Sequence, residues 1–315
     1  MVVLPEDLLV HFHEPDDFCY PEWWAIAKKI EAENLPAKEE ECWWRELVIT
    51  WLGRVRGRLG ANYKIFESQS FFLLIDPTDK PAKEYVLFLE QMRKTLHGAL
   101  RDAVWKGKGR HVVMLFDHRE DYYKYIAPFY SEGEHPSSGG VFLQGGGYAH
   151  IAAPYNKDSV RRTLVHEYAH NCVAHLPLPR WLNEALAMRL EALLVSQPRM
   201  MVDAEAREKH DEHWNDSTIQ GFWSGEGWGI PGEGVGLSYQ LARVLFAKIE
   251  NGFLPSHDRL IAFIKQAHMR DAGEAAARQI FKFSLGDLAA DFLGKGDWAP
   301  QPEKWQAAGQ PVKGD

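Results

Sequence analysis

Two histidines four residues apart constrain the fold of this chain more than any other feature of its sequence. They enclose the segment His166-Glu167-Tyr168-Ala169-His170. Residues at this spacing lie one above the other on the same face of an α-helix. We therefore expect a helix here, with both imidazoles able to reach a single metal ion and the Glu167 carboxylate beside them.

The flanking sequence favours that helix. Asn156 or Asp158 can cap its N-terminus, and Pro177 and Pro179 end it. The sequence thus predicts a helix over 158–175. An H-E-x-x-H motif on a helix is typical of zinc proteases, in which the histidines bind zinc and the glutamate is a general base.

A catalytic zinc site needs a third protein ligand and one open position. Glu184 lies in Arg180–Ala187, which reads RWLNEALA, near the start of the next predicted helix and after a turn at Leu176–Pro179. A second helix folded back on the first would bring Glu184 to the ion and complete a site with two histidines and one glutamate. The alternative is a polar helix face and an unrelated surface carboxylate.

H-E-x-x-H followed by Trp181-Leu182-Asn183-Glu184 resembles the gluzincin metallopeptidases, in particular the aminopeptidase N family and peptidase-MA-like bacterial proteins. The resemblance implies that Glu184 is the third zinc ligand and Glu167 the general base. It also implies a tyrosine, early in a later helix, whose hydroxyl stabilises the oxyanion, and Tyr239 fits that pattern. The implied fold is α+β, with a small mixed β-sheet lobe, then a mainly helical lobe, and the zinc site at their junction.

The chain also departs from the family pattern. The 13 residues between His170 and Glu184 are fewer than in aminopeptidase N. Ala185 replaces the usual glycine, and Met188 stands where a second carboxylate is expected. No G-x-M-x-N motif, which holds a substrate N-terminus in aminopeptidase N, is found in the sequence. The resemblance therefore gives little support to an aminopeptidase activity, and endo- or exopeptidase action is left open.

The pattern of apolar and turn residues divides the chain into three segments. Residues 1–60 are expected to be helical, 61–155 to form an α/β sheet lobe, and 156–315 to form a helical zinc-binding lobe. Strands are predicted at Tyr63–Phe66, Phe71–Ile75, Val112–Phe116, Val141–Gln144 and Ala149–Ala153, with a helix over Ala82–Trp105. The glycine-bracketed strand within 141–153 could pair with an extended peptide as a substrate-binding edge.

Large apolar residues recur at steps of four in the first segment, at Trp43, Leu47, Trp51 and Val55. This spacing predicts a buried stripe on one face of a helix. A ligand site lined by the tryptophans is the alternative. The segment 1–60 could also cover the cleft and inhibit an enzyme, or it could complete the core. Deletion of these residues would distinguish the two.

The last segment carries helix patterns and two apparent interruptions. Helices are predicted at 158–175, 181–196, 237–251, 256–269, 273–281 and 285–293. Gly221–Gly236 is rich in Gly and Trp and is expected to be an irregular loop beside the cleft, or disordered. Lys209–His213 is expected to be a solvated charged turn. His11 and His13 show no partner pattern in the sequence and are expected to be surface residues.

Composition limits the class of partner. The net charge of −8 disfavours nucleic acid, and three cysteines disfavour a disulfide framework. No basic N-terminal region or long apolar run is present, so we expect a soluble, cytoplasmic protein without a membrane partner. The oligomeric state is left open.

These features together predict a zinc-dependent metallopeptidase with one Zn²⁺ per chain. The expected substrate is a peptide or a protein, hydrolysed by a metal-activated water with Glu167 as the base. Two alternatives stay open: a zinc-binding but catalytically inactive recognition or regulatory protein, and a zinc hydrolase of non-peptide bonds.

Overall fold

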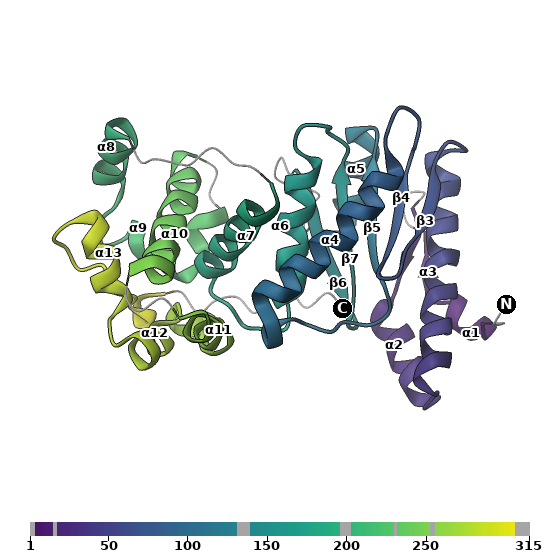
Figure 1. The fold of residues 1–315 in the computed structure, drawn as a ribbon, viewed down its shortest axis with the longest axis horizontal. Helices are drawn as coiled ribbons and strands as arrows, with labels where there is room; N and C mark the ends of the chain where they lie inside the picture. The colour runs from purple at the N-terminus through teal and green to yellow at the C-terminus, as the bar shows by residue number, and fades with distance from the viewer. Residues whose placement is uncertain are drawn as a thin grey trace. The chain divides into compact units, whose positions relative to one another are not determined.

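The fold is mixed α and β: the described residues form a five-stranded sheet, a separate two-stranded pair and a mainly helical region (Figure 1). The computed structural model describes residues 4–14, 18–130, 139–195, 203–229, 232–252 and 256–305. The chain forms two compact units: Met1–Thr95 with Lys106–Asn171, and Leu96–Trp105 with Cys172–Lys313.

A five-stranded sheet with the order β3-β4-β5-β7-β6 forms the centre of the first unit. Its strands are β3 (Lys64–Glu67), β4 (Phe71–Ile75), β5 (His111–Phe116), β6 (Val141–Gly145) and β7 (Tyr148–Pro154). The central strands β4, β5 and β7 run parallel, and the edge strands β3 and β6 are antiparallel to their neighbours. All five strands predicted from the sequence are confirmed. A separate antiparallel pair joins β1 (Phe12–His13) and β2 (Tyr20–Pro21).

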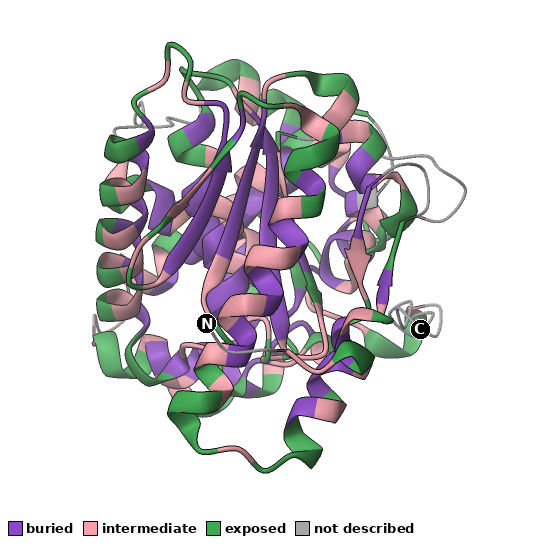
Figure 2. Cartoon of the chain, turned by 90° about the vertical axis from the view of Figure 1, so that its right-hand side faces the viewer, coloured by how far each residue is buried: buried purple, intermediate pink, exposed green. Residues whose placement is uncertain are grey.

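The central strands are buried on both faces because helices cover each side. In Figure 2 these strands are coloured as buried, while exposed residues lie on the outward sides of the flanking helices. Parallel strands need helices on both faces of the sheet, because their side chains are apolar on both faces.

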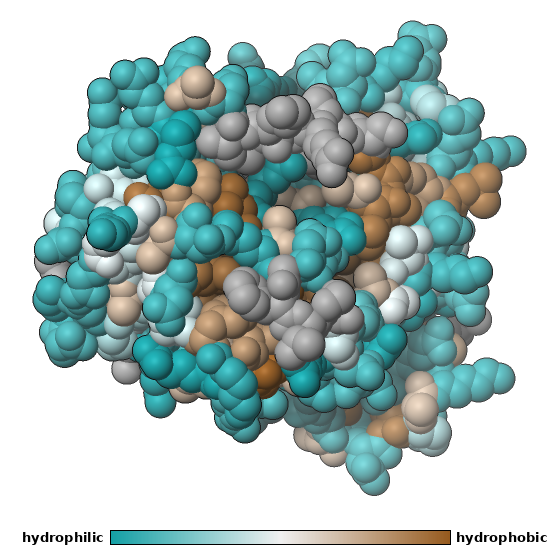
Figure 3. All heavy atoms as spheres, turned by 60° about the vertical axis from the view of Figure 1, so that its left-hand side comes forward, coloured by the Kyte–Doolittle hydropathy of each residue, from teal (hydrophilic) through white to brown (hydrophobic). Residues whose placement is uncertain are grey.

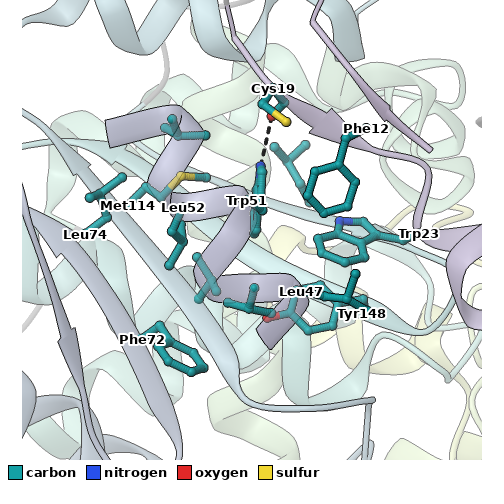
Figure 4. Packing of buried hydrophobic residues seen from close by; sticks show 14 of the residues in the cluster. Phe12, Cys19, Trp23, Leu47, Trp51, Leu52, Phe72, Leu74, Met114 and Tyr148 are labelled. Carbon is teal, nitrogen blue, oxygen red and sulfur yellow. Dashed lines mark hydrogen bonds between the residues drawn. The ribbon is translucent and has the colours of Figure 1, made fainter. Parts of the chain in front are cut away.

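The N-terminal helices complete the core on one face of the sheet. They are α1 (Glu6–Leu9), α2 (Trp23–Ala32) and α3 (Ala37–Leu59), joined on this face by α5 (Arg119–Ile126). Trp51 is fully buried among sheet residues such as Met114, and its indole N–H donates to the Cys19 carbonyl at 2.9 Å (Figure 4). The buried tryptophan stripe predicted for α3 is therefore confirmed as core.

Helices α4 (Ala82–Leu100) and α6 (Val160–Val173) pack on the other face. The ring of Tyr168 on α6 lies 5.5 Å from that of Phe71 on β4. The ring of Tyr85 on α4 lies 6.1 Å from that of Tyr155, which follows β7. Helix α6 therefore rests directly on the sheet.

His150 is an imidazole buried inside the first unit, with 4% of its surface exposed. Its Nε2 is hydrogen-bonded to the Tyr125 hydroxyl at 2.8 Å, and its ring lies 5.0 Å from that of Trp51. Burial lowers the pKa of His150 from 6.5 to about 3. The residue is therefore neutral in the folded chain at ordinary pH.

This burial predicts a pH-dependent loss of stability. Because the pKa is lower in the folded state, acid adds a proton to the unfolded chain first. The stability that neutral His150 provides is complete above about pH 6.5, and it falls by ~1.4 kcal/mol per pH unit toward pH 3. Urea unfolding of the wild type and of His150→Gln at pH 7 and pH 5 measures this. We expect a shallower pH slope in the variant, and equal slopes would contradict the assignment.

The second unit is built from helices. They are α7 (Arg180–Leu194), α8 (Ala204–His213), α9 (Thr218–Ser224), α10 (Glu233–Gly252), α11 (His257–Gln266), α12 (Glu274–Phe281) and α13 (Leu285–Leu293). Short 3₁₀ turns lie at Arg101–Ala103, Glu226–Gly229, Met269–Asp271 and Pro302–Lys304, with one more in the first unit at Ala127–Phe129. Helix α10 packs against α7, α8, α11 and α13 (Figure 1).

The glycine-rich segment was predicted wrongly as irregular throughout. Gly221 lies inside α9, a 3₁₀ turn follows, and α10 already begins at Glu233, while residues 230–231 lie outside the described residues. Gly225 ends α9 with φ of 91°, a conformation that glycine adopts without strain. Gly234 lies close to His213: a Cβ there would be 2.8 Å from Cε1 of that ring, which would have to move.

His210 differs from its predicted surroundings, and two other histidines have a partner that the sequence did not reveal. Lys209–His213 is the last part of helix α8 rather than a turn, and His210 is fully buried against Trp214. His11 and His13 both lie against the Glu22 carboxylate, at 3.1 and 3.0 Å. Their common partner comes from a different element, so local spacing could not reveal it.

Hydrophilic residues cover most of the face drawn in Figure 3, with apolar residues gathered in smaller patches. None of the described helices is long and apolar enough to cross a membrane.

Candidate metal centre

The three predicted ligands lie together in the structure. One ligand atom from each of His166, His170 and Glu184 lies within 4.8 Å of the other two. The two imidazole rings are 4.7 Å apart between centroids and stand at 82° to each other. The four-residue spacing on α6 therefore has the consequence predicted for it: two ring edges are presented side by side.

The start of α6 is fixed by Asn156. Its Oδ1 accepts hydrogen bonds from the backbone N–H groups of Asp158 and Ser159, at 3.0 and 3.2 Å. Of the two predicted capping residues, Asn156 therefore forms the turn. The helix then continues to Val173, so His175 lies beyond its end. Partial burial lowers the pKa of the His175 imidazole below its usual value.

Contacts behind α6 set the rotation of the helix about its axis. Tyr168 and Asn171 face the sheet, where both reach His111 at the start of β5. The Tyr168 hydroxyl lies 3.3 Å from His111 Nε2, and the Asn171 amide nitrogen lies 3.0 Å from Nδ1. Since these residues face the sheet, His166 and His170 point away from it.

A short, hydrogen-bonded connection leads from α6 to α7. Leu178 N–H donates to the Leu176 carbonyl at 2.8 Å, and Pro179 precedes the first residue of α7. The Trp181 indole N–H donates to the Ala272 carbonyl at 2.9 Å, which holds the first turn of α7 in place. Glu184 is the fifth residue of this helix and therefore lies close to the connection.

Tyr239 is carried by α10, the helix that packs against α7. Arg189 on α7 donates from Nε to both carboxylate oxygens of Glu250 on α10, at 2.8 and 2.7 Å. The Tyr239 ring lies 5.0 Å from the Trp228 ring at an angle of 82°. Its proposed action on an oxyanion stays a prediction.

Glu167 follows the first histidine and is half-buried. Tyr130, at the end of a 3₁₀ turn, has a pKa raised above its usual value, chiefly by burial and additionally by the negative charge of Glu167. Tyr130 and His111 are the residues around α6 that sequence reasoning missed. Neither belongs to a motif, and both are far from α6 along the chain.

The edge strand β6 passes close to α6. A Cβ placed on Gly140, just before β6, would lie 2.4 Å from Cγ2 of Thr163, one turn before His166. Glycine is needed at this position because the backbone approaches the helix so closely. Among the described residues, the chain thus contacts α6 just before it enters β6, which is an edge strand of the sheet.

Comparison with known proteins adds no relative: no family model matches the chain, and no curated protein matches it. The function must therefore be argued from the residues and their geometry. Three features bear on it: the cluster of two histidines and one glutamate, the adjacent Glu167, and the edge strand beside α6.

Proposed function

We propose that this protein is a zinc-dependent metallopeptidase of the gluzincin kind. The observation that carries the proposal is the cluster of His166, His170 and Glu184, whose ligand atoms lie within 4.8 Å of one another. A helix with H-E-x-x-H and a glutamate on the next helix is the donor set of a catalytic zinc site.

The cluster fits a single small ion. Zinc binds imidazole nitrogen and carboxylate oxygen at about 2.0–2.2 Å, so tetrahedral ligands lie about 3.4 Å apart. The observed limit of 4.8 Å requires only small side-chain rotations to reach that spacing. Three protein ligands leave the fourth position for water, as catalysis requires.

The remaining chemistry belongs to residues of the chain. A bound zinc ion would supply a Lewis acid and a water of lowered pKa. Glu167 accepts the proton of the attacking water and delivers it to the leaving amine. Tyr239 is proposed to donate a hydrogen bond to the oxyanion, and loss of one such donor typically lowers turnover about 10²–10³-fold.

Strand β6 favours a peptide as the substrate. It lies at the edge of the sheet, beside α6, and an extended peptide can add to such an edge through main-chain hydrogen bonds. That pairing is independent of side-chain identity, so the cleavage preference would depend on neighbouring side chains.

Cleavage of a diverse peptide pool by zinc-loaded protein tests the proposal. Mass spectrometry would identify the products, and metal analysis would give the zinc content per chain. We expect one zinc per chain and new peptide ends. Bound zinc without cleavage of any peptide would instead favour the inactive recognition protein, and hydrolysis of esters alone would favour a non-peptide hydrolase.

Replacing Glu184 by Ala is expected to weaken zinc binding. Residues that merely orient a ligand cost about 10–100-fold in metal affinity when lost, so a direct ligand should cost more. Competition with a chromophoric chelator would measure the affinity, with Glu205→Ala on α8 as an exposed control. Wild-type affinity in Glu184→Ala would remove this residue from the ligand set.

A further inference from the structure

The second unit contains a cavity that the proposed peptidase chemistry does not use. Its volume is about 760 Å³, within the range of small-molecule sites. Its walls come from the end of α8, from α9, from the first turns of α10 and from Lys304 and Trp305. None of the three metal-cluster residues lines it.

Its aromatic walls are fixed in orientation. The Trp305 indole N–H donates to Oε1 of the buried Gln220 at 3.0 Å, and the other end of that amide donates to the Ala299 carbonyl. The Trp214 indole N–H donates to Nδ1 of His210 at 2.7 Å. Phe222, the third aromatic residue of the lining, stacks on Trp228 with ring centroids 5.7 Å apart. Trp214 and Phe222 are only 6% and 1% exposed, so the half-buried Trp305 ring is the apolar face of this lining that a ligand can reach.

Neutral polar groups lie between these rings. Ser238 lines the cavity and is only 3% exposed, and within the described part of the chain its hydroxyl forms no hydrogen bond. The half-buried His213 ring also forms none there, and burial lowers the pKa of this histidine. The polar atoms of these two side chains are reached by solvent, so a ligand in the cavity could replace water as their hydrogen-bond partner.

Charged residues of the lining are restricted to exposed positions. They are Asp216, Glu226 and Lys304, two carboxylates and one ammonium group. The rest of the lining therefore offers the face of Trp305 and neutral hydrogen-bonding groups. The three charged residues together carry a small excess of negative charge. A phosphate or another anion would be disfavoured there.

We propose that this cavity binds a neutral saccharide of one or two rings. A sugar ring has a flat C–H face that packs on fixed aromatic side chains, and hydroxyls that both donate and accept hydrogen bonds. A peptide fits less well, because the walls are helices and turns and offer no strand edge for its backbone. The inference is independent of the metal cluster and of any peptidase activity.

Binding of neutral disaccharides to the full-length protein tests the inference. The probes are maltose, cellobiose, lactose and N,N′-diacetylchitobiose, with AMP and an acetylated tripeptide amide as comparisons. Saturation-transfer NMR detects binding, and calorimetric titration gives its affinity. We expect at least one disaccharide to bind at millimolar concentration or below.

Two variants locate the site. Trp305→Ala removes a stacking face and should weaken binding about tenfold. Ser238→Ala removes one hydrogen bond with little change in volume and should weaken it about fivefold. Trp24→Ala is the matched control, since Trp24 is 69% exposed on α2 of the other unit.

The result that would overturn the inference is equally definite. Absence of saccharide binding, binding of AMP or the tripeptide instead, or saccharide binding that neither variant weakens would each do so. Thermal melting of each variant shows that it is folded, so a loss of binding can be assigned to the cavity.

Discussion

Glu167→Gln is expected to slow peptide hydrolysis strongly while zinc remains bound. Glutamine has the size of glutamate but cannot accept a proton at neutral pH, and residue 167 is not among the three clustered ligands. General acid–base groups contribute about 10²–10⁴-fold, so kcat/KM should fall by that factor. The measurement is the rate on one peptide from the cleaved pool, with zinc content determined in the same sample.

The control for this variant is another carboxylate of the same chain. Glu205→Gln changes an exposed residue on α8 and should leave both the rate and the zinc content unchanged. A wild-type rate in Glu167→Gln would exclude this residue as the base, even if zinc is bound. A lower zinc content would show instead that the substitution disturbs the cluster.

The fold around the cluster explains how a local motif becomes a site. H-E-x-x-H only aligns two imidazoles on one face of the helix. The direction of that face depends on the contacts on the opposite side of the helix. Tyr168 and Asn171 make these contacts with His111 on β5. On α7, the hydrogen bond from Trp181 to the Ala272 carbonyl holds the turn that precedes Glu184.

Much of this arrangement could be predicted because its signals are local. The strands are short apolar runs between turn residues, and α6 and α7 carry helical periodicity with prolines between them. Zinc ligation by Glu184 was inferred from its place on a helix that folds back after a short turn. The structure brings the residue to both histidines, as that inference required.

The parts that escaped prediction depend on long-range contacts. Helix α8 carries little apolar periodicity, and His210 is buried only because Trp214, Gln240 and Phe292 surround it. The glycines of 221–236 suggested a loop, but Gly234 lies in α10, where it packs close to the ring of His213. Spacing along the chain contains no information about either contact.

The sequence left open whether residues 1–60 inhibit an enzyme by covering its cleft or complete the hydrophobic core. The burial of their apolar side chains favours the core. Residues from α2 and α3 form one continuous apolar cluster with strands β4, β5 and β7. Removal of residues 1–60 would expose that face of a sheet whose central strands are apolar on both sides. We therefore expect the truncated chain to be insoluble rather than a faster enzyme.

Trp51→Ala tests the same point without removing a segment, and we expect a large loss of stability. Trp51 is fully buried and packs edge-on against Trp23, with ring centroids 5.2 Å apart, as well as against His150. Truncation of such a tryptophan costs about 3–5 kcal/mol, and it also leaves the Cys19 carbonyl without the indole donor. Urea unfolding, followed by circular dichroism, would measure the free energy of unfolding.

Trp24→Ala is the matched control for this prediction, because Trp24 lies on α2 beside Trp23 but is 69% exposed. Its loss should change the free energy of unfolding by no more than about 0.5 kcal/mol, as surface substitutions usually do. Similar losses in the two variants would contradict the core assignment. If Trp51→Ala alone is destabilised, the first 60 residues are part of the folded sheet unit, and a role as a detachable inhibitor is excluded.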